Sequence, residues 1–120
     1  HGSTFGGNPL VTGVASSVLD VFESDLILDN VMKMSQYFES EFQSKIMNFK
    51  VVKELRIKGL MIGIGLDENI IDCSKLTQKA LEDKLLINIT GNSIRMLPPL
   101  IISKKEVDIL IKKIIKLITI

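Results

Sequence analysis

The stretch NITGNSIRMLPPL, residues 88–100, is the segment around which the rest of the chain is organised. It predicts a short strand that rises out of a Gly91-Asn92 turn and stops at Pro98-Pro99. Because side chains alternate along a strand, the apolar neighbours of Arg95 would share one face of the sheet and Arg95 would point to the other. An arginine held in this way is a cation with little freedom to move.

Arg95 is also unusual in its residue type. The chain carries 15 lysine and arginine residues, but arginine occurs only at Arg56 and Arg95. Lysine supplies a point charge, whereas arginine adds a planar fork that matches a carboxylate with two hydrogen bonds. Arg95 is therefore a candidate for holding an anionic substrate group. The alternative is an edge-strand charge that discourages aggregation, and spacing alone does not separate the two hypotheses. The simplest interpretation of Arg56 is a solvated charge.

Composition limits the class of protein. The length of 120 residues suits one domain with a modest core. A net charge of +1 gives no global field that would recruit nucleic acid. The single cysteine, Cys73, excludes an internal disulfide, fits a reducing compartment such as the cytoplasm, and with a single histidine leaves no cluster of soft metal ligands. The hydrophobic content of 46% is high for a small domain and indicates a missing partner.

Hydrophobic periodicity predicts four helices and a small sheet. The expected helices are 10–22, 24–47 with Ser24 or Asp25 as its cap, 72–83 with Asp72 as its cap and Leu81 turned inward, and one that begins at Ser103 in a capping box with Glu106. The expected strands are 51–57, with Lys58-Gly59 as the connection to the next, 60–66, 85–89 and the strand of Arg95. These elements predict an α+β fold, with an antiparallel sheet of three to four strands and helices packed on one face.

The first ten residues, HGSTFGGNPL, form a second candidate site. Glycines free the backbone, Ser3 and Thr4 offer hydroxyls, and Asn8 caps a helix whose first turn holds Pro9. Hydroxyls and free amides near a helix start suit a phosphate group. A flexible end that leads into a capped helix is the commoner explanation of such a segment.

Two further features can be interpreted either as structural or as functional. Cys73 lies in the first turn of a helix, where a thiol of low pKa is conceivable, but a small buried residue is the favoured interpretation. The last helix has one apolar arc and an opposite arc of lysines. Such a helix can lie on a membrane surface, but docking onto the core is favoured here. No apolar run reaches the roughly 18 residues of a membrane span.

Three segments in order resemble one family. HGSTFGGNPL at 1–10, LRIKGLMIGIGL at 55–66 and IRMLPPLIIS at 94–103 are similar to the C-terminal part of the class III (ornithine-type) aminotransferases, which depend on pyridoxal 5′-phosphate. The resemblance covers essentially the whole chain. It implies the small domain of a fold type I homodimer, with residues 1–23 as a leading segment and 24–120 as the C-terminal small domain.

The resemblance also implies roles for residues. The threonine of the first motif, Thr4, with Ser3 beside it, would contact the cofactor phosphate bound in the neighbouring subunit. Arg95 would grip the α-carboxylate of an amino acid or of 2-oxoglutarate. The lysine that binds the cofactor lies upstream in the family, on an N-terminal large domain, so this chain would hold no catalytic residue and would be inactive alone.

Some positions depart from the family pattern. Lys84 stands where a glycine commonly ends a helix, and Gly65 replaces a residue that is often acidic. Two other classes of function stay open: a non-catalytic module that docks onto a large-domain partner, and a membrane-surface protein that uses the lysine-rich last helix.

Overall fold

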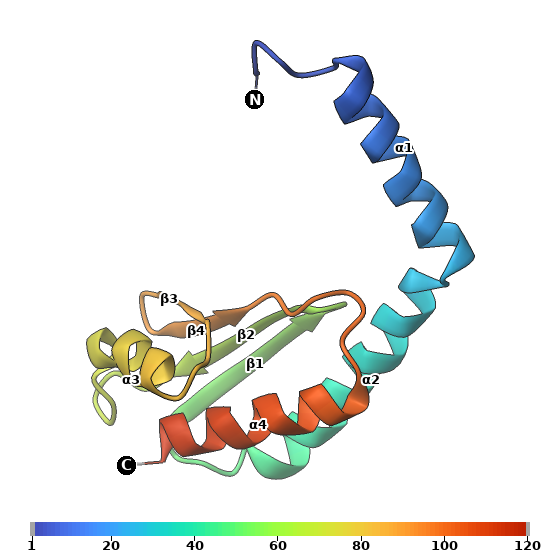
Figure 1. The fold of residues 1–120 in the computed structure, drawn as a ribbon. Helices are drawn as coiled ribbons and strands as arrows, with labels where there is room; N and C mark the ends of the chain where they lie inside the picture. Colours follow the sequence, from blue (N-terminus) through green and yellow to red (C-terminus); the bar gives the residue numbers. More distant parts are fainter. Residues whose placement is uncertain (1, 120) are drawn as a thin grey trace.

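The computed structural model describes residues 2–119, and His1 and Ile120 lie outside the described residues. Figure 1 shows two long helices in sequence, then a sheet, with the last helix lying along it. The elements are α1 (Pro9–Ser24), α2 (Ile27–Lys45), β1 (Val52–Lys58), β2 (Met61–Leu66), the short 3₁₀ helix η1 (Cys73–Lys75), α3 (Leu76–Glu82), β3 (Asn88–Thr90), β4 (Ser93–Met96) and α4 (Lys104–Ile118).

The strands form one antiparallel sheet in the order β1-β2-β4-β3. Alternation along β2 separates the two faces: Ile62, Ile64 and Leu66 are fully buried, while Met61 on the other face is exposed. Helices α2 and α4 pack against each other and close the buried face, as Figure 1 shows. The opposite face carries no helix in residues 2–119. The predicted α+β class and the small antiparallel sheet with helices on one face are confirmed.

The core lies between the sheet and the two long helices. Phe38 and Phe42 of α2 stack with ring centroids 5.6 Å apart and are fully buried. From α4 the buried residues are Val107, Ile111, Ile114, Leu117 and Ile118. The apolar arc of the last helix is therefore used inside the protein, as favoured from the sequence, and is not available to a membrane. Within residues 2–119, no helix combines the length and the apolar character that a membrane crossing requires.

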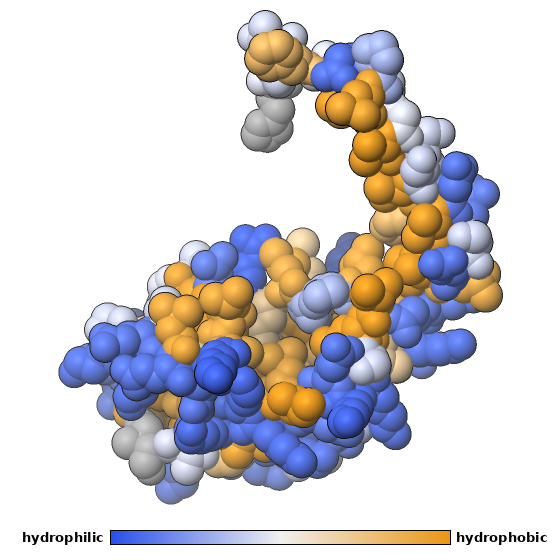
Figure 2. Space-filling model, viewed as in Figure 1, coloured by the Kyte–Doolittle hydropathy of each residue, from blue (hydrophilic) through white to orange (hydrophobic). Residues whose placement is uncertain are grey.

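Helix α1 differs from every other long element because none of its residues is buried. It extends from the start of α2 away from the sheet (Figure 1), and the molecule measures 52 Å along its longest axis. Figure 2 shows apolar side chains along one side of α1 that continue onto the body of the protein. A groove of about 690 Å³ runs there, lined mostly by α1, with Ile27, Leu100 and Ile101 at its base.

Predicted helix caps are present at three positions. The Asn8 side chain accepts a hydrogen bond from the Val11 amide, and the Asp72 side chain accepts one from Ser74. Ser103 and Glu106 form the reciprocal capping box, and these hydrogen bonds from Ser103 hold the pKa of the Glu106 carboxyl below its usual range. Capping residues therefore identified the starts of α1, η1 and α4. The helix predicted over 72–83 is instead the 3₁₀ turn η1 followed by α3, which begins at Leu76 without a side-chain cap.

Three local predictions were wrong. Helix α2 begins after Leu26, which is left-handed (φ 51°), and it has no side-chain cap, so neither Ser24 nor Asp25 caps it; the two instead bond to each other. The third strand covers 88–90 and not 85–89, because Lys84 turns the chain at the end of α3. Leu81 is 53% exposed, since only Leu76 and Ala80 of α3 face the core.

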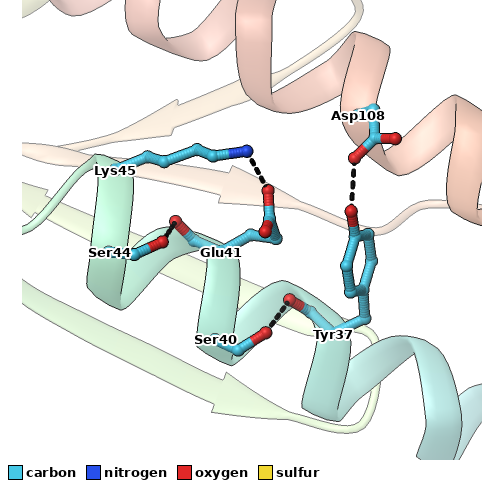
Figure 3. Close-up of polar contacts among 6 residues, drawn as sticks. All are labelled: Tyr37, Ser40, Glu41, Ser44, Lys45 and Asp108. Atoms are coloured by element: carbon cyan, nitrogen blue, oxygen red, sulfur yellow. Dashed lines mark hydrogen bonds and ion pairs between the residues drawn. The ribbon is translucent and has the colours of Figure 1, made fainter.

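One polar contact ties α2 to α4. The Tyr37 hydroxyl donates to a carboxylate oxygen of Asp108 at 2.6 Å (Figure 3), and the Lys104 ammonium lies 4.6 Å from the centre of the Tyr37 ring. This hydrogen bond, helped by burial and by the charges of Asp108 and Glu41, raises the pKa of Tyr37 to about 12 from 10.0. The protonated phenol is therefore favoured in the folded state.

Because Tyr37 is the only tyrosine, its titration can be followed directly by phenolate absorbance. We expect a midpoint near pH 12 in the folded chain, against 10.0 when unfolded. The stabilisation is fully present below pH 10 and is lost as pH rises through 12, because only the protonated phenol donates. Asp108→Asn should lower the midpoint towards 10.0, and a wild-type midpoint already at that value would contradict the hydrogen bond.

Lys84 ends α3 in a conformation that suits glycine. Its φ is 54°, its amide donates to the Leu81 carbonyl, and the Leu85 amide donates to the Ala80 carbonyl, which together close the helix end. The Lys113 ammonium donates to the carbonyls of Asp83 and Lys84 from α4. The turn is thus held by its neighbours, although a side chain in the left-handed region carries a steric cost.

We expect Lys84→Gly to raise the free energy of unfolding by about 0.5–1 kcal/mol, because glycine adopts a positive φ without that cost. Urea denaturation monitored by circular dichroism measures the change. The matched control is Lys79→Gly, an exposed lysine in the interior of α3, which should instead lose about 1 kcal/mol. Destabilisation of equal size at both positions would show that the Lys84 conformation carries no strain.

Candidate functional site

Arg95 is the third residue of β4, which forms a hairpin with β3. Gly91 has φ 58° in the two-residue turn, which places Thr90 opposite Ser93. Asn92 joins this turn to the end of β2, since its side-chain amide donates to the Leu66 carbonyl at 3.2 Å and its own carbonyl accepts from the Leu66 amide at 2.8 Å. The hairpin is thereby fixed to the centre of the sheet.

The side chain of Arg95 points away from the core, as its position predicted. Its neighbours Ile94 and Met96 are 0% and 4% exposed, while Arg95 itself is exposed on the helix-free face. Within residues 2–119 no carboxylate pairs with its guanidinium. Arg95 belongs to a paired strand, and the residues on either side of it are buried, so its backbone position is well defined. Its guanidinium has no ion-pair partner within residues 2–119. β4 lies between β2 and β3, so Arg95 is not on an edge strand.

The segment after β4 is held by hydrogen bonds from α2. The Asn30 side-chain amide of α2 donates to the carbonyls of Leu100 at 2.8 Å and Ile102 at 3.2 Å. The Ile102 amide donates to the Pro99 carbonyl, which makes a turn directly after the two prolines. The hydrogen bonds of Asn30 tie the segment that follows β4 to α2. Sequence reasoning did not identify Asn30, because only the fold shows where its amide points.

The second arginine, Arg56, lies on the same helix-free face as Arg95. Its Nη2 atom donates to the Ser93 hydroxyl at 3.1 Å and lies 3.4 Å from a carboxylate oxygen of Glu54. Gly65 of β2 leaves room for the Glu54 side chain, because a Cβ there would come within 2.5 Å of it, whereas a Cβ at Gly63 would be in ordinary contact with Arg56 at 3.7 Å. Arg56 is thus exposed but held, which the sequence interpretation as a solvated charge missed.

The second candidate site, around Ser3 and Thr4, lies before α1. The segment folds as a turn in which the Ser3 hydroxyl accepts from the Phe5 amide at 3.3 Å and the Ser3 carbonyl accepts from the Gly6 amide. Gly7 has φ 80°, and the Asn8 side chain donates to the Phe5 carbonyl. Thr4 is exposed, and its hydroxyl makes no hydrogen bond within residues 2–119. The turn is therefore ordered locally, with one hydroxyl unused.

The structure does not bring the two predicted sites together. Ser3 and Thr4 lie at the outer end of α1, whereas Arg95 lies on the sheet (Figure 1), and the hollow that Arg95 lines includes neither Ser3 nor Thr4 among its lining residues. If both sites serve one reaction, the chain alone does not assemble it.

Cys73 is not an activated thiol. It is partly buried, and its burial, reinforced by the nearby carboxylates of Glu68 and Asp72, raises the pKa of the thiol. The thiol donates weakly to the Ile71 carbonyl. The favoured interpretation of Cys73 as a small buried residue holds in part, because Cys73 packs against the core but is only partly buried. Within residues 2–119 no three side chains of histidine, cysteine, aspartate or glutamate gather as a metal site would require.

Comparison with known proteins assigns the family. The family model described as aminotransferase class-III matches residues 1–118. The chain belongs to the class-III aminotransferase family. Its similarity to acetylornithine aminotransferase of Caldanaerobacter subterraneus is 43% identity over 109 residues, and its similarity to ornithine aminotransferase of Bacillus subtilis is 41% over 115 residues. The family resemblance inferred from the three motifs is confirmed.

Solved structures of the class-III aminotransferase family share this fold. Acetylornithine aminotransferase from Elizabethkingia anophelis is 34% identical with a TM-score of 0.84, and ornithine aminotransferase from Toxoplasma gondii, whose crystals hold PLP at partial occupancy, is 31% identical with a TM-score of 0.85. Each match covers 98% of this chain but only 32% and 28% of the respective structure. The two sequence relatives are likewise covered over 27% of their length, against 90% and 95% of this chain.

Proposed function

We propose that this chain is the C-terminal part of a pyridoxal-phosphate-dependent aminotransferase that moves an amino group between an amino acid and 2-oxoglutarate. The observation that carries the proposal is Arg95: a guanidinium on a central strand, without a carboxylate partner in residues 2–119, in a chain of this family. N-acetylornithine is the proposed amino donor, which would place the enzyme in arginine biosynthesis in the cytoplasm, and acetylornithine aminotransferases among the relatives support it.

Other donors remain within the proposal as alternatives. Ornithine aminotransferases match this chain about as well as acetylornithine aminotransferases do. Succinylornithine and 4-aminobutyrate are further candidates. Groups that recognise the far end of the donor would lie mostly on the remaining part of the enzyme.

The role of Arg95 in the reaction is to bind and orient. Its planar fork would donate two parallel hydrogen bonds to the α-carboxylate, and this fixes the rotation of 2-oxoglutarate about its α-carbon. N-acetylornithine carries an α-carboxylate too, but the amino group that it transfers is on its δ-carbon, because its α-amino group is acetylated. Arg95 would therefore bind both substrates, and it would orient the reacting carbon of 2-oxoglutarate alone. The carbonyl contacts of Asn30 would keep the strand of Arg95 in place while the substrate is held.

The residues before α1 fit the phosphate of the cofactor. The Thr4 hydroxyl is exposed and unused within residues 2–119, and the turn precedes the positive end of the α1 dipole, which favours an anion. Thr4, with Ser3 beside it, would therefore hold the phosphate of pyridoxal phosphate in the neighbouring subunit. When bound, that cofactor supplies the electron sink for the amino transfer.

Two partners are part of the proposal. Residues 1–23 would act as a leading segment and 24–120 as the small domain, joined to an N-terminal large domain that carries the cofactor lysine. The exposed apolar side of α1 and the groove of about 690 Å³ beside it support such a partner, because a helix with no buried residue leaves its apolar side in water. A homodimer would bring Thr4 to the second subunit's cofactor. The chain alone would be inactive.

Replacing Arg95 tests the carboxylate role. In the assembled enzyme we expect Arg95→Ala to raise KM for both the amino donor and the oxo acid, with a loss of about 2–4 kcal/mol in transition-state stabilisation measured from kcat/KM. Arg95→Lys keeps the charge and loses the planar guanidinium. Its kcat/KM should fall between those of the wild-type enzyme and Arg95→Ala. Unchanged KM for both substrates would contradict the role.

Replacing Thr4 tests the phosphate role. We expect Thr4→Ala to weaken retention of pyridoxal phosphate by about tenfold, the size of one hydrogen bond to a charged group, as measured by cofactor absorbance after dialysis. Thr12→Ala is the matched control, because the Thr12 hydroxyl is already bonded to carbonyls of its own helix. Equal retention in the two variants would count against Thr4.

A further inference from the structure

Residues of three neighbouring strands form a regular grid on the helix-free face of the sheet. In one row Gly63 of β2 is paired with Arg56 of β1 and with Arg95 of β4. In the next row Gly65 is paired with Glu54 and with Ser93 on the same two strands. Residues paired directly across strands point to the same face. Because both central positions are glycines, long side chains from β1 and β4 can lie flat across the middle of the grid.

The side chains of Arg56 and Glu54 cover the two glycines. The three atoms nearest to the position that a Cβ at Gly63 would take all belong to Arg56, at 3.7 to 3.9 Å. The three nearest to a Cβ position at Gly65 all belong to Glu54, at 2.5 to 3.2 Å. The Nη2 atom of Arg56 then donates to the Ser93 hydroxyl at 3.1 Å and lies 3.4 Å from the Glu54 carboxylate. Arg56 thus follows one diagonal of the grid, from β1 to β4.

The other diagonal of the grid joins Arg95 to Glu54. Each diagonal spans two strand spacings and two residues, which separates the backbones by roughly 12 Å. Arg56 shows that an arginine can cover this distance, because it reaches the short side chain of Ser93 at the opposite corner. The Glu54 side chain already leans over Gly65, so Arg95 would have less distance to cover. The two diagonals cross, so the side chains of Arg56 and Arg95 cannot both lie along them.

An ion pair between Arg95 and Glu54 would conflict with the role proposed for Arg95. A carboxylate of the same chain on that guanidinium would compete with the carboxylate of the substrate. The hollow of about 920 Å³ over this face has two glutamates in its lining, Glu54 and Glu39. Glu54 is the one on the sheet, and it is paired with Arg56. Arg56 therefore holds the carboxylate that Arg95 could otherwise bind.

We propose that Arg56 is a positioning residue that keeps Arg95 available for substrate, because it holds Glu54 and occupies the space between Glu54 and Arg95. The proposal deepens the function proposed above and rests on it for the carboxylate role of Arg95. It assigns Arg56 no contact with substrate, since Arg56 acts on Arg95 through Glu54. Without Arg56, the Arg95 side chain would lie across β2 onto Glu54, and the substrate would have to displace that ion pair.

The contact itself is tested in the isotope-labelled chain without ligand, through the arginine Nε–H resonances in NMR. We expect Arg56→Gln to shift the Arg95 resonance, and Glu54→Gln added to that variant to return it to the wild-type position. Lys58→Gln is the matched control, because it removes an equal charge from the lining of the same hollow and should leave the Arg95 resonance unchanged. Glu39→Gln added to Arg56→Gln restores the same charge as Glu54→Gln and should not reverse the shift.

The consequence for the reaction is tested in the assembled enzyme. Arg56→Gln should raise KM for 2-oxoglutarate about two- to sixfold, the effect of an exposed ion pair that the substrate must displace. The value of kcat should change little, because that ion pair is already broken once the substrate is bound. Glu54→Gln should restore KM in the Arg56→Gln background, whereas Glu39→Gln should not. If Arg56 only stabilised its strand, a second substitution at Glu54 would not rescue KM.

Two outcomes would overturn the proposal, and they are distinguishable. If Arg56→Gln leaves the Arg95 resonance in place, or if Glu54→Gln does not reverse the shift, Arg56 does not separate the two side chains, and the carboxylate role of Arg95 is untouched. If the resonances behave as expected but KM for 2-oxoglutarate is unchanged, Arg95 does not bind that substrate and the proposed function fails as well. Circular dichroism verifies folding. If Arg56→Gln unfolds, Arg56→Thr, which suits a strand, replaces it with the same expectations.

Discussion

The pairing of β2 with β4 is the constraint on which the rest of the structure depends. Ile64 opposite Ile94 and Ile62 opposite Met96 place four buried side chains on one face. The register of β2 against β4 is fixed, because a slip of one residue would move these apolar side chains from the core face to the solvent face. The same register sets Gly63 beside Arg95 on the opposite face. The register that packs the core therefore also determines where Arg95 lies on the opposite face.

Much of this arrangement follows from short-range chemistry. Alternation along residues 60–66 and around Arg95 predicted which side chains are buried, and caps at Asn8, Asp72 and Ser103 predicted where helices begin. These signals succeed because they depend only on strand geometry and on unpaired amides at helix starts. The prediction failed at Leu26, where a left-handed residue and not a polar cap begins the helix.

The candidate site was predictable only in part. Arg95 could be placed outside the core from its apolar neighbours, but the hydrogen bond of Arg56 to Ser93 could not, because Ser93 lies on another strand, 37 positions along the chain. The Asn30 contacts likewise join residues about seventy positions apart. Ser3 and Thr4 were singled out by their hydroxyls and the neighbouring glycines and cap, and the family resemblance then suggested a role for them. Physical patterns thus identify candidate groups, while assembly depends on long-range pairing.

Helix α1 has a thermodynamic consequence for the whole molecule. It has 16 residues, and none of them is buried in the core. Isolated helices of about this length are only marginally stable in water. Its helical state is therefore coupled to whatever surface lies against its apolar side. Association and helix ordering then become a single event, in which lost chain entropy is offset by the contact. The turn bearing Thr4 directly precedes α1, so its position would be set by that same event.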